Sequence, residues 1–284
     1  MITIKSLLDV DFDTIYEAFK LAFSDYEIQL EKYELQNMLQ RRGFVAELSF
    51  GAFDNNQLVA FTLNGIGCHK NVKTAYDTGT GTIEAFRGRG LASQVFEYSL
   101  PYLKRAGVKC YLLEALQHNT KAISVYSKLG FEVVREFAYF VQDLEHIKAN
   151  EEGSSAVCDI KVISLSECQS AKHFFDFEPS WQNGFESIGR SINSFQLWGA
   201  FENKQLVGLM VFEPTSGDVT QLAVDKAHRR KGVATCLLKH AISQGKHPSI
   251  KIINTNLECE AITQFLKAQG ITMSGKQFEM VKEL

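Results

Sequence analysis

The spacing of hydrophobic residues divides the chain into two series of predicted strands and helices. Apolar residues recur at every second position in some stretches, as in strands, and at three- and four-residue intervals in others, as in helices. The strands predicted for the first series cover residues 2–7, 45–53, 58–63, 73–83, 108–116 and 131–141. Its predicted helices cover residues 11–23, 33–39, 91–106 and 119–129.

The same order of elements returns in the second series. Strands are predicted at residues 158–165, 197–201, 206–212, 219–224 and 250–253, and helices at residues 166–174, 232–244 and 257–269. Residues 149–157, between the two series, are mostly small and polar without a hydrophobic period, so they are expected to form a linker. The pattern therefore predicts two copies of one α/β unit.

Composition agrees with two soluble domains and narrows the possible partners. The chain has 284 residues, 45% hydrophobic and 22% charged, and domains usually hold roughly 100–200 residues. A net charge of −3 does not favour a nucleic-acid partner. Neither a secretory signal nor a membrane-spanning run is visible, so a cytoplasmic protein with no membrane partner is expected. The six cysteines show no zinc-site spacing, so no metal is expected; the oligomeric state stays open.

Two six-residue loops are the clearest candidates for ligand binding. Residues 87–92 read Arg-Gly-Arg-Gly-Leu-Ala, and residues 229–234, which begin 142 positions later, read Arg-Arg-Lys-Gly-Val-Ala. Both loops lead from a predicted strand into a predicted helix. A helix N-terminus attracts phosphate, and glycine lets a ligand approach the backbone. A tight turn with solvated charges could explain one loop, but the repetition favours phosphate binding.

The spacing R-x-x-G-x-A in these loops resembles the pyrophosphate loop of the GNAT superfamily of acyl-CoA N-acyltransferases. In the first half, the resemblance continues through Leu-Glu-Ala-Leu-Gln-His-Asn (residues 113–119), Ala122, Tyr126 and the pair Gly130-Phe131. It implies a tandem GNAT protein of the α/β class, with domains at residues 1–148 and 158–284. Each domain would have a central mixed, mostly antiparallel sheet flanked by helices, with two strands splayed to admit the cofactor.

The resemblance also implies where acetyl-CoA would bind as co-substrate. The pyrophosphate would lie on the backbone of Arg87, Gly88, Arg89, Gly90, Leu91 and Ala92. The strand ending at Thr82 and Ile83 would pair with the pantetheine arm and polarise the acetyl carbonyl, and Asn119 would contact pantetheine or adenosine. A possible second CoA loop in the second half would comprise Val224, Arg229, Arg230, Lys231, Gly232, Val233 and Ala234.

Acetyl transfer to an amine needs a base and an acid on opposite sides of the thioester. Glu114 ends an otherwise apolar strand face and is the candidate base, acting directly or through water; an exposed glutamate at a strand end is the alternative. Tyr126 follows twelve positions later and is the candidate acid; an aromatic side chain packed on the sheet is the alternative. The ribosomal-protein N-terminal acetyltransferase branch of the superfamily has the same spacing.

The second half does not repeat this pair. One alignment places Ile253 and Phe265 at the two positions, and another places Asn254 and Leu266 there. The second domain is therefore expected to be catalytically degenerate, although its loop could still bind CoA.

Two further stretches have open interpretations. Residues 76–81, Tyr-Asp-Thr-Gly-Thr-Gly, could form a bulge, a site of close substrate approach, or a plain twisted strand. An aromatic-rich stretch early in the second half could pack in the core or line a substrate pocket; its members include Phe174, Phe175, Phe177, Trp181 and Trp198.

The predicted function is an N-acetyltransferase that uses acetyl-CoA and a primary amine. The acceptor is left open among a polyamine, an aminoglycoside, an amino acid and a peptide N-terminus. The alternatives are a non-catalytic CoA-binding sensor or scaffold, and the transfer of a longer acyl or an aminoacyl group.

Overall fold

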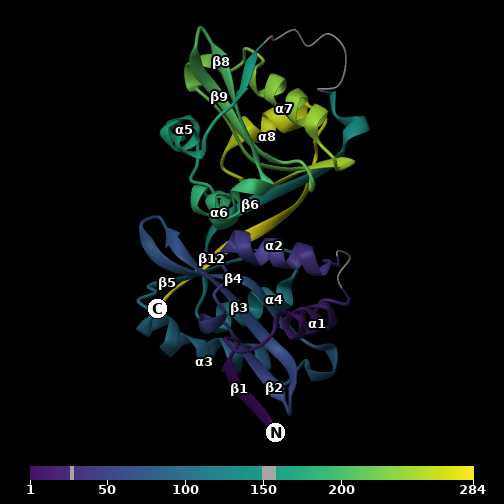
Figure 1. Ribbon diagram of the computed structural model, residues 1–284, viewed down its shortest axis with the longest axis vertical. Coiled ribbons are helices and arrows are strands. Elements are labelled where there is room, and N and C mark those ends of the chain that lie inside the picture. Colours follow the sequence, from purple (N-terminus) through teal and green to yellow (C-terminus); the bar gives the residue numbers. More distant parts are fainter. Residues whose placement is uncertain (26–28, 149–157) are drawn as a thin grey trace. The chain divides into compact units, whose positions relative to one another are not determined.

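The computed structural model describes residues 1–25, 29–148 and 158–284, and it divides into two compact units (Figure 1). Unit 1 comprises Met1–Val134 and Glu279–Leu284, and unit 2 comprises Arg135–Phe278. The predicted linker, residues 149–157, lies outside the described residues.

Unit 1 is built on a mixed, mostly antiparallel sheet, as expected. Its strand order is β1–β2–β3–β4–β5–β12; β4 and β5 are parallel, and the pairs from β1 to β4 are antiparallel. Its strands are β1 (Ile2–Ser6), β2 (Phe50–Asp54), β3 (Gln57–His69), β4 (Val72–Thr82), β5 (Cys110–Leu116) and the end of β12 (Met273–Glu283). The predicted strand at residues 45–53 is shorter than expected, because Ala46–Leu48 form a 3₁₀ turn before β2.

Helices cover both faces of this sheet (Figure 1). Helices α1 (Phe12–Ala22) and α2 (Lys32–Arg42) bury apolar side chains against Phe61 and Leu63 of β3. Helix α3 (Leu91–Arg105) packs on the other face, where Val95 contributes to a core with Phe50 of β2 and Ala60 of β3. Helix α4 (Thr120–Lys128) follows β5. Consecutive strand residues point to opposite faces, so each strand can serve both layers.

Unit 2 repeats this plan. Its strand order is β12–β6–β11–β10–β9–β8–β7, in which β10 and β11 are parallel and the pairs β6–β11, β10–β9, β9–β8 and β8–β7 are antiparallel. Its strands, apart from β12, are β6 (Glu132–Asp143), β7 (Asp159–Val162), β8 (Gln196–Glu202), β9 (Gln205–Glu213), β10 (Asp218–Val224) and β11 (Ser249–Asn256). Its helices are α5 (Leu165–Ser170), α6 (Phe185–Arg190), α7 (Val233–Gln244) and α8 (Glu260–Ala268).

The two units do not coincide with the expected ranges 1–148 and 158–284. Strand β6, which the sequence pattern placed at the end of the first domain, pairs with β11 of unit 2. Strand β12 was not predicted, and its end lies in unit 1, where the Leu284 N–H donates to the Lys109 carbonyl at 3.0 Å. The difference arises because a period-two pattern identifies a strand without identifying the strand that pairs with it.

Two properties of the described residues bear on membranes and metals. None of the helices in the described ranges is long and apolar enough to cross a membrane. Within the same ranges, no three His, Cys, Asp or Glu side chains gather where they could hold a metal ion.

Candidate active site

Strands β4 and β5 separate within unit 1 and form a gap that we call the β4–β5 opening. Within the described residues the two strands pair at three positions, of which Tyr76 with Leu112 is the last. Beyond this pair, β4 continues to Thr82. The register of β4 on β3 shifts between Asp77 and Gly79, so the intervening Thr78 forms a bulge. The bulge interpretation of residues 76–81 is therefore confirmed.

Glu114 lies at the β4–β5 opening and is held by Tyr76. The Tyr76 hydroxyl donates to Oε2 of Glu114 at 2.8 Å. Burial raises the pKa of Tyr76 well above its ordinary value, and the nearby Glu114 charge raises it further. Tyr76 therefore stays a hydrogen-bond donor at physiological pH and fixes the orientation of the Glu114 carboxylate. From α2, Arg42 donates to the Thr78 carbonyl at 3.2 Å, and its guanidinium lies 5.9 Å from the centre of the Tyr76 ring.

Tyr126 is held by Asp77, the residue of β4 that follows Tyr76. Its hydroxyl donates to Oδ2 of Asp77 at 3.0 Å, and its ring packs edge-on against Phe131. Asp77 also accepts hydrogen bonds from the Thr80 hydroxyl and the Gly79 N–H, both at 2.9 Å. Burial raises the pKa of Asp77, while these hydrogen bonds act in the opposite direction.

The two candidate catalytic residues therefore contact consecutive residues of one strand. Tyr76 and Asp77 point to opposite faces of the sheet because strand side chains alternate. Glu114 accordingly lies on the face covered by α1 and α2, and Tyr126 lies on the face covered by α3. This arrangement places a carboxylate and a phenol on opposite sides of the β4–β5 opening, as a base and an acid for one thioester require.

The sequence analysis assigned no role to Tyr76, Asp77 or Arg42. One available signal was Asp77 itself, because aspartate is depleted in strand interiors. Arg42 ends α2, and a basic residue at a helix C-terminus is common for electrostatic reasons, so nothing local distinguished it.

The loop at residues 87–92 has the geometry expected of an anion site. Gly88 and Gly90 adopt φ values of +77° and +71°, which are left-handed and favour glycine. A Cβ atom on Gly88 would meet nothing within 4 Å, so the space in front of the loop is open. Helix α3 begins directly after Gly90 and has no acidic residue in its first turn. Its N-terminal N–H groups and dipole therefore favour a negatively charged ligand.

The Arg87 side chain stabilises this loop through hydrogen bonds and an ion pair. Its guanidinium donates to the Thr82 carbonyl at 3.2 Å and to the Ala22 carbonyl at 2.8 Å, and it pairs with Asp25 at 2.8 Å. The Arg87 hydrogen bond lowers the pKa of Asp25. The side chain thus joins the end of β4 to the end of α1, which leaves the loop backbone as the surface for a phosphate.

Arg229 repeats this arrangement in unit 2. It donates to the Val224 and Phe174 carbonyls, both at 3.1 Å, and pairs with Asp176 at 3.0 Å. Arg230 occupies the position equivalent to Gly88 with a left-handed φ of +62°, and Gly232 has a φ of +85°.

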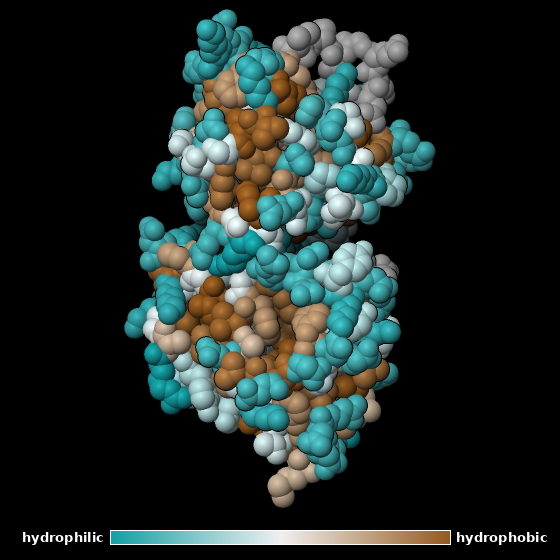
Figure 2. Space-filling view, in the orientation of Figure 1, coloured by the Kyte–Doolittle hydropathy of each residue, from teal (hydrophilic) through white to brown (hydrophobic). Residues whose placement is uncertain are grey.

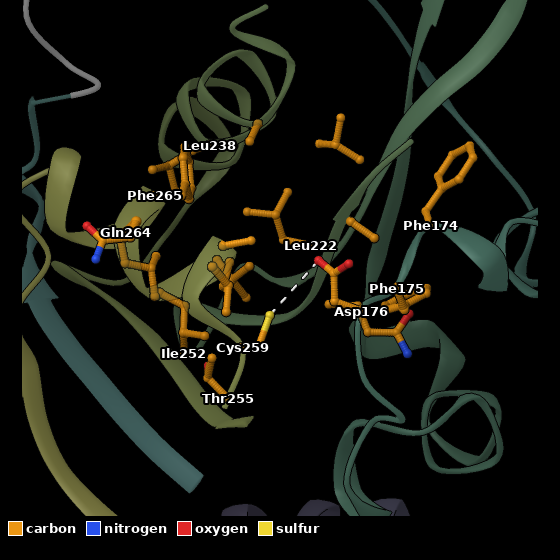
Figure 3. Close-up of a pocket in the computed structure, with 18 of the residues that line it drawn as sticks. Phe174, Phe175, Asp176, Leu222, Leu238, Ile252, Thr255, Cys259, Gln264 and Phe265 are labelled. Carbon is orange, nitrogen blue, oxygen red and sulfur yellow. Dashed lines mark hydrogen bonds between the residues drawn. The ribbon is translucent and has the colours of Figure 1, made fainter. Parts of the chain in front are cut away.

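Unit 2 contains a cavity of about 640 Å³ beside this second loop. Within the described residues β10 and β11 pair at one position, Asp218 with Lys251, and then separate. Hydrophobic side chains gather on the face of unit 2 between α5 and α7 (Figure 2). The close-up in Figure 3 shows the cavity among β10, α7 and α8, with Asp176 contacting Cys259 across it. Phe174, Phe175 and Phe177 line the cavity, whereas Trp198 packs in the core.

The structure identifies the positions in unit 2 that correspond to the candidate catalytic residues Glu114 and Tyr126. Ile253 lies two residues after the strand pair Asp218–Lys251, just as Glu114 lies two residues after the pair Tyr76–Leu112. Leu266 is the seventh residue of α8, as Tyr126 is of α4. Each sequence alignment was therefore right for one of the two positions.

Asn254 explains why no single alignment placed both counterparts. It has a left-handed φ of +58°, and the register of β11 on β6 shifts between Ile252 and Thr255. One additional residue thus lies between the strand position and the helix position.

Comparison with known families decides the identity of the two units. A model described as "Acetyltransferase (GNAT) family" matches residues 12–131, and one described as "Acetyltransferase (GNAT) domain" matches residues 167–279. The chain belongs to the GNAT acetyltransferase family. It carries the family's domain twice, as the sequence analysis predicted.

Curated relatives of this GNAT protein include two N-alpha-acetyltransferases. N-alpha-acetyltransferase MAK3 of Arabidopsis thaliana is 27% identical over 100 residues, which are 35% of this chain and 53% of the relative. N-alpha-acetyltransferase 30 of Schizosaccharomyces pombe is 29% identical over 86 residues, which are 30% of this chain and 57% of the relative. The matches thus span little more than half of either relative.

Solved structures share the fold over nearly the whole chain. A tandem GNAT protein from the clavulanic acid biosynthesis pathway aligns with a TM-score of 0.76 at 11% identity, covering 100% of this chain and 98% of that one. A GCN5-related N-acetyltransferase from Sphaerobacter thermophilus aligns with a TM-score of 0.72 at 14% identity, covering 99% and 95%. These likenesses establish the tandem GNAT fold.

The remaining site residues of this GNAT chain have the following positions. Thr82 ends β4, and its carbonyl accepts from Arg87. The Ile83 N–H donates to the Val59 carbonyl, and the Ile83 carbonyl accepts from the Phe86 N–H. The Asn119 side chain accepts from the Ala122 N–H at 3.1 Å and caps α4.

Proposed function

We propose that unit 1 transfers an acetyl group from acetyl-CoA to a primary amine, with Glu114 as base and Tyr126 as acid. One observation carries this proposal: the two side chains bind consecutive residues of β4 and so lie on opposite sides of the β4–β5 opening. Acetyl-CoA would supply a thioester whose carbonyl carbon the amine attacks.

Glu114 would prepare the amine for attack. An α-amine has an ordinary pKa of about 7.7–8.0 and a lysine amine about 10.4, so both are mainly protonated at neutral pH. The Glu114 carboxylate would accept the proton that the nitrogen loses, directly or through a water molecule. The buried Tyr76 hydroxyl holds the carboxylate toward the β4–β5 opening while this happens.

Tyr126 would protonate the leaving group. Tyr126 lies on the face of the sheet that α3 covers. The loop at residues 87–92 leads into α3, and the pyrophosphate of CoA would bind the backbone N–H groups at the start of this helix. As the carbon–sulfur bond breaks, the phenol can give its proton to the sulfur. Asp77 holds the phenol in position before this step, and the O–H turns from Asp77 to the sulfur as the proton is given.

The acceptor class that the relatives support best is a peptide α-amine. Two curated relatives are named N-alpha-acetyltransferases, which favours this acceptor over a polyamine, an aminoglycoside or a free amino acid. The test is a panel of a peptide with a free N-terminus, the same peptide blocked at its N-terminus but carrying an internal lysine, spermidine and an aminoglycoside. Release of the CoA thiol should be fastest with the free N-terminus. Thiol release with none of the amines would contradict catalysis and leave the CoA-binding sensor as the function.

Replacing Tyr126 with Phe should lower kcat by about 10²-fold, within the usual range for a lost general acid. Acetyl-CoA affinity should change little, because the variant lacks only the hydroxyl and keeps the ring contact with Phe131. Steady-state kinetics and calorimetric titration measure the two quantities. A kcat equal to that of the wild type would show that Tyr126 is not the acid.

Replacing Asp77 with Asn should lower kcat about tenfold, comparable to losing one hydrogen bond to a charged group. The neutral amide accepts a weaker hydrogen bond from Tyr126 than the carboxylate does, and so does a protonated Asp77, so in both cases the phenol is held less firmly in position. The wild-type rate should therefore fall toward the variant's rate as the pH drops through the raised pKa of Asp77. Measurements of kcat from pH 5 to 9 for the wild type and the Asn variant check this expectation. Profiles of the same shape for the two proteins would contradict it.

Thermal unfolding provides the control for this variant. A raised folded-state pKa means that the ionised Asp77 costs stability once the pH exceeds that pKa. The Asn variant should therefore unfold at no lower temperature than the wild type at neutral pH.

A further inference from the structure

The cavity of unit 2 has a basic loop at its rim and a largely apolar interior, and Asp176, which also lines it, is paired with Arg229. Arg230 lies at its rim, beside the N-terminus of α7, and the next residue, Lys231, is also exposed. Leu222, Leu238 and Phe265 enter the interior from β10, α7 and α8 (Figure 3). The rim thus matches an anionic group, and the interior matches a hydrocarbon.

The interior is apolar at the positions where unit 1 is polar. Four polar residues of the β4–β5 opening have apolar counterparts that all line the cavity: Asp77 corresponds to Val219, Thr80 to Leu222, Glu114 to Ile253 and Tyr126 to Leu266. At these positions unit 2 has no side chain that can accept or give a proton. The same replacements remove the polar surroundings that a small acetyl group meets in unit 1.

We infer that the cavity of unit 2 is a non-catalytic acyl-CoA site that selects acyl chains longer than acetyl. The inference rests on the proposed function in one respect. Both assume that loops such as residues 87–92 and 229–234 bind CoA. The pyrophosphate would lie at residues 229–234, where Arg230 and Lys231 supply positive charge. The acyl chain would lie among Leu222, Leu238 and Phe265.

Chain-length selectivity follows from the apolar lining. Each methylene moved from water into such an interior favours binding about fourfold. Octanoyl-CoA carries six methylenes more than acetyl-CoA, so burial of only some of them gives a large preference. Unit 1 should show no comparable preference, because Asp77, Thr80 and Tyr126 occupy the matching positions.

The test uses the full chain with Gly88→Asp and Glu114→Gln, which places a negative charge at the loop of unit 1 and removes its base. Calorimetry then compares octanoyl-CoA, acetyl-CoA and free octanoate. Octanoyl-CoA should bind about tenfold or more tightly than either other ligand, and it should release no thiol in the presence of peptide amines. Adding Arg230→Asp, a change at an exposed loop position, should abolish this binding. Adding Leu222→Thr, which copies Thr80 of unit 1, should remove most of the octanoyl preference.

Three results would overturn the inference. They are equal affinity for octanoyl-CoA and acetyl-CoA, octanoate binding as tightly as octanoyl-CoA, and octanoyl-CoA binding that persists after Arg230→Asp. Thiol release by the starting variant would show that unit 2 is catalytic. The acetyl-transfer assay of the wild-type chain is separate, so failure of the proposed function in unit 1 would be recognised independently.

Discussion

Replacing Glu114 with Gln should lower kcat for acetyl transfer by about 10²–10⁴-fold, the range expected for a general base. The amide is nearly isosteric and can still accept from Tyr76, so the structure of the β4–β5 opening should persist. It cannot take a proton from the attacking amine. Acetyl-CoA affinity should stay near that of the wild type, because the loop at residues 87–92 is unchanged.

The matched control for this variant is Glu97→Gln. Glu97 is an exposed residue of α3, so its replacement removes one negative charge without altering the β4–β5 opening. Both variants should be assayed across pH with a peptide acceptor. In the wild type, the base can take the proton of the amine, so activity should persist at pH values where the amine is protonated, whereas the Gln variant should gain activity only where the amine is already neutral. Equal loss of activity in the two variants would reject Glu114 as the base.

Local signals in the sequence were enough to predict the repeated unit. Hydrophobic periodicity, the glycines before α3 and α7, and the loops at residues 87–92 and 229–234 each depend on residues close together in the chain. These features located most of the helices and strands. They could not show that β6 pairs with β11, because strand partners are selected by the whole fold rather than by the strand's own pattern.

The candidate site was predictable only in part for the same reason. Glu114 and Tyr126 lie twelve residues apart, so spacing within the sequence could suggest them as a pair. Their partners Tyr76 and Asp77 come from another strand, 38 and 49 residues away. A bulge at Thr78 also changes the order in which side chains of β4 alternate; the sequence offered a bulge at residues 76–81 as one of three interpretations, and the strand register decides for it.

The contacts of the Arg87 side chain come from parts of the chain that the loop's own sequence does not indicate. Its guanidinium is engaged by Asp25 and two backbone carbonyls. Arg229 forms the same set of contacts in unit 2. The arginine therefore shapes the loop, and the anion-binding capacity belongs to the backbone at the start of the helix.

A matched pair of loop variants should establish which unit transfers the acetyl group. Gly88→Asp should reduce kcat/KM for acetyl-CoA by roughly 100-fold, because a carboxylate near the pyrophosphate site repels it strongly at short range. Arg230→Asp, the equivalent change in unit 2, should reduce it far less, since unit 2 lacks the base and the acid. The left-handed backbone costs an aspartate about 1 kcal/mol at Gly88, and no atom lies within 4 Å of its Cβ position.

Gly88→Asn separates charge from backbone strain in this experiment. Asparagine has nearly the shape of aspartate and tolerates the same left-handed conformation, but it carries no charge. If repulsion of the pyrophosphate causes the loss, the Asn variant should keep most of the activity, and high salt should partly restore the Asp variant. Equal losses in the Asp and Asn variants would indicate a distorted loop instead. A larger loss in Arg230→Asp than in Gly88→Asp would move the catalytic assignment from unit 1 to unit 2.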